Sequence, residues 1–168
     1  MTKVITLSIL LCLFLSPIVL NQAIAQEKKT GLPLPRFVSL RSDTVNIRTG
    51  PGLRYPIAWV YKKRTMPVEI IAEFETWRKV RDWENTVGWV HQSMLTGKRT
   101  MIIVNSTQTI RKHGAAYGSA IAEAEPGVVG QLIQCDKQDD WCRVKISKYE
   151  GWLRRTQMWG VYPRELVK

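Results

Sequence analysis

The residues best suited to bind a ligand are tryptophans, which recur beside basic residues along the chain. Seven tryptophans stand among 168 residues, against only two histidines. Indole rings offer large flat contact surfaces, and arginines and lysines pair with carboxylates. The candidate ligand-binding residues are Asn46, Arg48, Tyr55, Trp77, Trp89, Trp141 and Trp152. These residue types predict recognition of a ligand rather than its chemical conversion.

A glycine-rich turn at residues 50–52 raises the question of a phosphate-binding loop. Such turns often cradle phosphates with their backbone amides. A Walker loop would need Lys and then Ser or Thr after its last glycine, and a dinucleotide-binding turn would open into a helix. Gly52 is instead followed by L-R-Y-P at 53–56 and then by β-prone residues. We therefore interpret 50–52 as the entry to the first long loop of a small β-fold.

The run V-N-I-R at 45–48 positions the first two candidates. Successive side chains of a strand point to opposite faces. Val45 and Ile47 are therefore expected to anchor the core. Asn46 and Arg48 share the opposite, outward face.

The same parity argument applies to two tryptophans that open similar runs, W-R-K-V at 77–80 and W-C-R-V at 141–144. If the closing valine of each run faces the core, the opening tryptophan faces away from it. Trp77 and Trp141 would then either form exposed aromatic platforms or pack under a loop or at a seam between domains. Two further tryptophans are expected in the core or in a groove, namely Trp89 and Trp152.

Motifs for catalysis are missing from the sequence. His91 follows a β-prone run, but no Ser or Cys nucleophile motif accompanies it, and no G-x-S-x-G elbow occurs. We therefore expect a protein that is not an enzyme, with no catalytic residue, no metal site and no cofactor.

The pair Cys135 and Cys142 predicts a disulfide. The two cysteines flank a polar turn at 136–140, so runs at 132–135 and 141–145 can form a hairpin that places them opposite each other. An even number of cysteines in an exported chain favours this pairing. A metal site is the alternative, but no further Cys or His stands nearby at ligand spacing.

Short β-prone runs broken by turn residues predict an all-β fold. No sustained 3.6-residue apolar period occurs, so helices are expected to be single turns at most. The runs lie at residues 37–40, 45–48, 58–61, 68–74, 77–81 and 87–91.

A repeat shows that this fold occurs twice. Three landmark pairs are separated by 63, 64 and 63 residues, respectively Ile47 and Ile110, Trp77 and Trp141, and Trp89 and Trp152. A near-constant offset indicates two copies of one unit of about 60 residues, a size at which a single core just suffices. The first domain is expected at 36–98 and the second, divergent one at 99–168. Apolar residues at 102–104 favour a short, stiff junction.

The first 25 residues read as a secretory signal. Lys3 precedes an apolar run at 4–20, and a small-x-small pattern predicts cleavage between Ala25 and Gln26. A retained membrane anchor is the alternative, but the run is short for a span. Residues 26–35 form an extended, proline-containing lead-in.

Cleavage would leave a strongly basic chain, since only Lys3 of its charges is lost from the formal +11. A basic exported protein meets acidic polymers such as wall peptides, lipopolysaccharide or nucleic acid. Each basic run is either a solvated face or part of a binding surface. The runs are Lys62-Lys63-Arg64, Arg78-Lys79-Arg81, Lys98-Arg99 and Arg154-Arg155.

The run V-N-I-R-T-G-P-G at 45–52, combined with V-G-W-V at 87–90, resembles the bacterial SH3 domain (SH3b), as found in exported tandem SH3-like proteins of alphaproteobacteria. The resemblance implies a small β-barrel that recognises ligands, often cell-wall peptides, and that carries no catalysis. The second copy departs from the pattern, with Thr109 at the position of Asn46 and H-G at 113–114 for the glycine–proline turn. Its ligand surface is therefore expected to be lost or different.

Together these features predict two tandem SH3-like barrels that act in the periplasm or outside the cell. The expected partner is a peptidoglycan peptide or an envelope protein, and the expected state is a monomer with no stable membrane insertion after cleavage. The alternative is a secreted interaction or virulence-type protein with a charge-driven acidic ligand, lipopolysaccharide or nucleic acid. Export disfavours nucleic acid.

Overall fold

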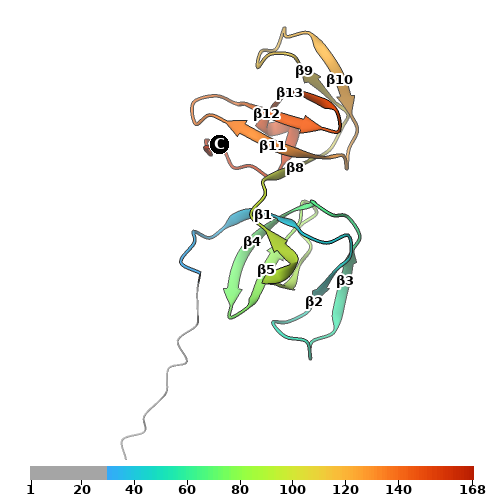
Figure 1. The fold of residues 1–168 in the computed structure, drawn as a ribbon, viewed down its shortest axis with the longest axis vertical. Helices are drawn as coiled ribbons and strands as arrows, with labels where there is room; N and C mark the ends of the chain where they lie inside the picture. Colours follow the sequence, from blue (N-terminus) through green and yellow to red (C-terminus); the bar gives the residue numbers. More distant parts are fainter. Residues whose placement is uncertain (1–29) are drawn as a thin grey trace, which may run out of the picture.

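A computed structural model describes residues 30–168 and shows two small β-barrels stacked along the long axis (Figure 1). The predicted signal peptide and its cleavage between Ala25 and Gln26 lie outside the described residues. Each barrel is a coiled seven-stranded antiparallel sheet. The predicted all-β fold in two tandem copies is therefore confirmed.

The first barrel consists of seven strands in the order β3-β2-β6-β5-β4-β1-β7. A single 3₁₀ turn, η1 (Gln92–Met94), separates its last two strands. The strands are β1 (Arg36–Leu40), β2 (Val45–Arg48), β3 (Ile57–Tyr61), β4 (Pro67–Phe74), β5 (Trp77–Arg81), β6 (Val87–His91) and β7 (Leu95–Thr96).

The second barrel repeats this order as β10-β9-β13-β12-β11-β8-β14. A 3₁₀ turn, η2 (Arg155–Gln157), again precedes its last strand. Among residues 30–168, no helix has the length and apolar character of a membrane span. The strands are β8 (Thr100–Ile103), β9 (Gln108–Arg111), β10 (Ala120–Ala124), β11 (Val129–Cys135), β12 (Trp141–Ile146), β13 (Tyr149–Arg154) and β14 (Met158–Trp159).

Strand alternation builds the core of the first barrel. Val45 and Ile47 are at most 1% exposed and pack with Val68, Val80 and Val90. Asn46, between the two buried residues of β2, is exposed. The predicted inward and outward faces of this strand are therefore confirmed.

The repeat has a direct structural counterpart. Arg48 of β2 pairs with Trp89 of β6, and Arg111 of β9 pairs with Trp152 of β13 in the same way. Ile110 is 1% exposed in the second core, as Ile47 is in the first. The two halves of the chain therefore use equivalent residues at equivalent places.

The predicted disulfide joins the β11–β12 hairpin. Cys135 and Cys142 are paired in register, their Cα atoms are 4.4 Å apart, and their sulfur atoms are bonded. Both side chains are fully buried in the second core. The hairpin and the disulfide are confirmed, because the turn at 136–140 brings its two ends face to face.

The two barrels contact each other directly at a junction formed by β1, β4 and the C-terminal segment. The ring of Phe37 lies 4.8 Å from that of Trp159 and 4.5 Å from that of Tyr162, measured between centroids. The Tyr162 hydroxyl donates to Glu69 Oε1 at 2.7 Å, and Thr100 Oγ1 donates to the carbonyl of Thr65 at the same distance. Aromatic packing and hydrogen bonds thus join the barrels.

Candidate functional site

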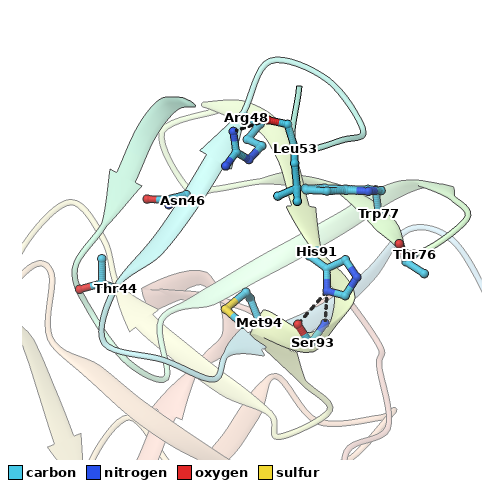
Figure 2. A pocket seen from close by; sticks show the side chains of 9 residues that line it. All are labelled: Thr44, Asn46, Arg48, Leu53, Thr76, Trp77, His91, Ser93 and Met94. Carbon is cyan, nitrogen blue, oxygen red and sulfur yellow. Dashed lines mark hydrogen bonds between the residues drawn. The ribbon is translucent and has the colours of Figure 1, made fainter. Parts of the chain in front are cut away.

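A groove of about 700 Å³ lies on the outer face of the first barrel, over strands β2, β5 and β6 (Figure 2). The loop at 49–56 borders it on one side, and η1 borders it on the other. Its walls are formed by Thr44, Asn46, Arg48, Leu53, Thr76, Trp77, His91, Ser93 and Met94.

Three of the predicted ligand-binding residues meet in this groove. Asn46 and Arg48 reach it from the outer face of β2, and Trp77 reaches it from the start of β5. They come together because β6 lies between their two strands in the sheet and all three side chains point away from the core.

Trp77 and Trp141 do not form exposed platforms, so that alternative is wrong at both positions. Each side chain is only 9% exposed, although each points away from the core-facing valine of its strand. The ring of His91 meets the Trp77 ring edge to face, with 5.5 Å between centroids, and Leu53 shares the groove wall with it. The second alternative, packing under a loop, fits both tryptophans.

Arg48 holds the loop that borders the groove. Its Nη1 donates to the carbonyls of Leu53 at 3.1 Å and Tyr55 at 2.7 Å. Arg48 is half-buried and lines the groove at the same time. Arg48 therefore fixes the position of Leu53 in the wall, besides being the only charged side chain among the described lining residues.

Tyr55 and Trp89 lie outside the groove lining. The Tyr55 ring packs on Gly50 so closely that a Cβ at that glycine would lie 2.4 Å from ring Cδ1. Glycine is needed at this turn because of that close approach. Trp89 is half-buried on β6, paired with Lys79 and Arg48 on the neighbouring strands.

His91 is a groove residue that the sequence did not single out as a ligand contact. Its Nδ1 accepts the backbone N–H of Ser93 at 3.3 Å and lies 2.7 Å from the Ser93 hydroxyl. His91 is thus the N-cap of η1. Because Nδ1 accepts a hydrogen bond, the proton of the neutral ring lies on Nε2, which can donate to a ligand. A catalytic Ser–His pair would need a third group to orient the ring, and no acid stands among the described lining residues.

Different residues cover the corresponding face of the second barrel. Arg154 stands at the position of His91, and its guanidinium carbon lies 5.1 Å from the centre of the Trp141 ring. The loop passes directly over the same tryptophan, since a Cβ at Gly114 would lie 3.1 Å from Trp141 Cβ and 3.3 Å from Trp152. Trp141 and Trp152 therefore contribute to packing within the second barrel.

The groove combines an apolar floor with a polar rim. Leu53, Trp77 and Met94 supply apolar surface. Neutral hydrogen-bonding groups surround them, together with one arginine. Such a surface suits an extended peptide, whose side chain enters the apolar part while its backbone groups bond to the rim. The missed residues are Leu53, from a loop of no regular period, and Thr44, Thr76, Ser93 and Met94, from turns.

Comparisons with known proteins agree with this architecture. The family model of the bacterial SH3 domain matches residues 41–97 and again residues 104–160. A search of the curated proteins found no match.

Two solved structures are weakly similar. NlpC1 from Trichomonas vaginalis is 12% identical over 82% of this chain and 50% of its own, with a TM-score of 0.35. NlpC2 from the same organism is 12% identical over 74% of this chain and 47% of its own, with a TM-score of 0.34. The chain thus spans about half the length of either protein, and we draw no functional conclusion from similarity at this level.

The two family matches cover most of the chain, which therefore belongs to the bacterial SH3 domain family and carries two copies of the domain in tandem.

Proposed function

We propose that this protein is a non-catalytic binding protein of the bacterial envelope, whose first barrel binds a cell-wall peptide in the groove between the 49–56 loop and η1. The second barrel supports the first and does not bind this ligand. The observation that carries the proposal is the asymmetry between the barrels. A groove lies beside Trp77, whereas the Arg154 guanidinium lies over Trp141 at the equivalent place.

The composition of the groove supports a short peptide as the ligand. Wall peptides carry small apolar side chains, amide bonds and carboxylates. The apolar floor matches the first of these. Asn46 and the Nε2–H of His91 can donate to peptide carbonyls. Arg48 holds the loop through neutral backbone carbonyls, so its guanidinium can also attract a carboxylate.

The buried disulfide and the basic net charge support a location outside the cytoplasm. Disulfides persist in the periplasm and in secreted proteins and are rare in reducing compartments. A formal charge of +11 for the whole chain favours contact with the acidic polymers of the envelope. The protein is therefore proposed to be periplasmic or secreted.

Sedimentation with purified peptidoglycan at physiological salt tests the function. We expect the wild-type protein to be retained and to release no soluble wall fragments, because the groove offers binding groups without a nucleophile–base pair. Absence of retention would exclude the wall-peptide ligand, and release of fragments would exclude a purely binding role.

Leu53→Ala tests whether the groove is the site. Leu53 is 78% exposed, so its truncation leaves the core intact, and loss of its contact should weaken peptide binding by roughly fivefold to tenfold. Titration of stem peptides into the isotope-labelled protein should shift the indole signal of Trp77. Tyr117→Ala is the matched control, since Tyr117 is 95% exposed on the equivalent loop of the second barrel. Equal weakening by both substitutions would contradict this location.

A charge-driven acidic ligand is separated from this proposal by its salt dependence. Binding through counterion release falls steeply as salt is added. Binding in a mostly neutral groove with one arginine should change little over the same range.

A further inference from the structure

The four basic runs of the sequence differ in the contacts that they make in the fold. Arg78 and Arg81 form ion pairs with the buried Glu73 and Glu69. Arg155 donates to four backbone carbonyls, and its neighbour in the sequence covers Trp141. The arginines of these two runs are therefore occupied by structural contacts. The other two runs, at 62–64 and 98–99, meet at the junction of the barrels.

A second groove, of about 630 Å³, opens at this junction. We call it the junction groove. Its wall on the side of the first barrel includes Thr65, and its floor belongs to the outer face of β8, β11 and β12. The lining residues are Thr65, Gly97, Lys98, Arg99, Thr100, Val129, Gly130, Gln131, Leu132, Ile133, Lys145 and Lys168.

Strand register shows which side chains face this groove. Gln131 of β11 is paired with Thr100 on one side and with Lys145 on the other. Directly paired residues of an antiparallel sheet point to the same face. The Thr100 hydroxyl bonds to the Thr65 carbonyl of the first barrel, so Gln131 and Lys145 extend from the same face into the groove.

The junction groove carries an excess of positive charge. Four of its lining residues are cationic, and no acid stands among those that the structure describes. Arg99 is paired with Glu165, whose carboxylate accepts from both of its terminal nitrogens at 2.5 and 3.1 Å. The ammonium groups of Lys98 and Lys145 carry the remaining charge, and the exposed Arg64 adjoins the wall at Thr65. Glu150, opposite Lys145 on the neighbouring strand, is ion-paired with Arg143.

Contacts between the barrels hold the walls of the groove in place. Ser39 Oγ lies 2.6 Å from both the Lys98 carbonyl and Thr100 Oγ1. Lys63 Nζ donates to the carbonyl of Gly127 across the junction at 2.6 Å. The cationic groups are thus presented on a fixed framework, which lowers the entropic cost of binding.

We propose that the junction groove is an anion site for a ligand with two or more phosphate groups. Lysine binds phosphate as a point charge, without the planar fork by which arginine holds a carboxylate or a phosphate. The one arginine in the lining already holds Glu165 with this fork. The remaining ammonium groups favour a multiply charged anion. The site shares no lining residue with the peptide groove of the first barrel.

Calorimetric titration of the full protein with tripolyphosphate at physiological salt tests the site. The double substitution Lys98→Gln and Lys145→Gln should weaken binding about tenfold, because two charge-assisted contacts are lost. Lys112→Gln with Lys137→Gln removes the same charge from exposed positions outside the groove and should leave the affinity within about twofold. Thermal unfolding of both variants checks that they fold as the wild type does.

Further arms identify the source of the phosphate. Co-sedimentation with cardiolipin vesicles, whose headgroup carries two phosphate groups, would identify a lipid headgroup, with phosphatidylcholine vesicles as the neutral comparison. If the protein binds tripolyphosphate but does not sediment with the vesicles, the ligand is a free or polymer-borne phosphate. The proposal is overturned if neither probe binds, if citrate binds as tightly as tripolyphosphate, or if the two double variants lose affinity equally.

Discussion

Arg48 and Arg111 occupy the same place in the two barrels and bond to their loops in the same way. Arg48 Nη1 donates to Leu53 and Tyr55, and Arg111 Nη1 donates to the carbonyl of Gly118 at 2.8 Å. The second copy has Thr109 where the first has Asn46, yet it keeps this arginine. The arginine is thus needed for the loop in both copies, whereas the asparagine faces the groove only in the first.

Glu73 gives a prediction for the dependence of stability on pH at the scale of one residue. Burial would raise the pKa of its carboxyl, but hydrogen bonds from the backbone and hydroxyl of Thr30 and from Arg36 outweigh burial and lower the pKa from 4.5 to about 2. A lowered pKa stabilises the fold at pH values above 4.5, and this contribution is lost as the pH falls toward 2. Urea unfolding of wild type and Glu73→Gln should therefore differ in free energy at neutral pH and converge in acid. The exposed Glu84→Gln should follow the wild-type curve, and a constant difference between wild type and Glu73→Gln across pH would contradict the assignment.

The hairpin of β11 and β12 gives a prediction at the scale of an element. Its disulfide closes a short loop, with a sequence separation of 7, and both sulfur atoms lie in the core. Replacing Cys135 and Cys142 by alanine should lower the free energy of unfolding by about 2 kcal/mol, the value expected for a short loop. Denaturant unfolding measures this loss, which should fall on the second barrel and leave peptide binding by the first unchanged. Peptide mapping that finds both thiols free in the folded protein would refute the bond.

The junction gives a prediction for the whole molecule. Phe37 is 8% exposed and contacts both Trp159 and Tyr162, which makes it the centre of the contact between the barrels. We expect the wild-type protein to unfold in one calorimetric transition. Phe37→Ala should split this transition into two, because the barrels then lose their shared apolar contact. Phe74→Ala removes the same side chain from a position that is 36% exposed and should keep a single transition. Two transitions already in the wild type would contradict rigid coupling.

Much of the fold could be predicted from local sequence. The bounds of β2, β5 and β6 match the predicted runs, because alternation of apolar residues and the turns between them are encoded by neighbours in the chain. The short strands β7 and β14 were missed, since two residues carry no period. The bulged β10 was missed because its Ala-rich stretch has no clear alternation.

The candidate site was predicted only in part. Parity alone places Asn46, Arg48 and Trp77 on the outer face. Loops that fold back over the sheet decide the rest. They set how deeply Trp77 is buried, let His91 cap η1, and bring Arg154 over Trp141. The direction of a side chain is set by its neighbours in the strand, whereas its burial depends on loops and strands that are distant in the chain.

By itself the sequence determined two copies of a small β-barrel, the disulfide of the second copy, and the outward face of the first copy that holds the groove. Tertiary structure alone decided where the groove lies and which cations form ion pairs. It also decided that Tyr162 reaches Glu69, 93 residues earlier in the chain, and thereby joins the barrels. The physical reason is the separation along the chain of the residues that set each property. Periodicity is fixed by neighbouring residues, but burial and charge pairing depend on contacts that form only when distant strands and loops meet.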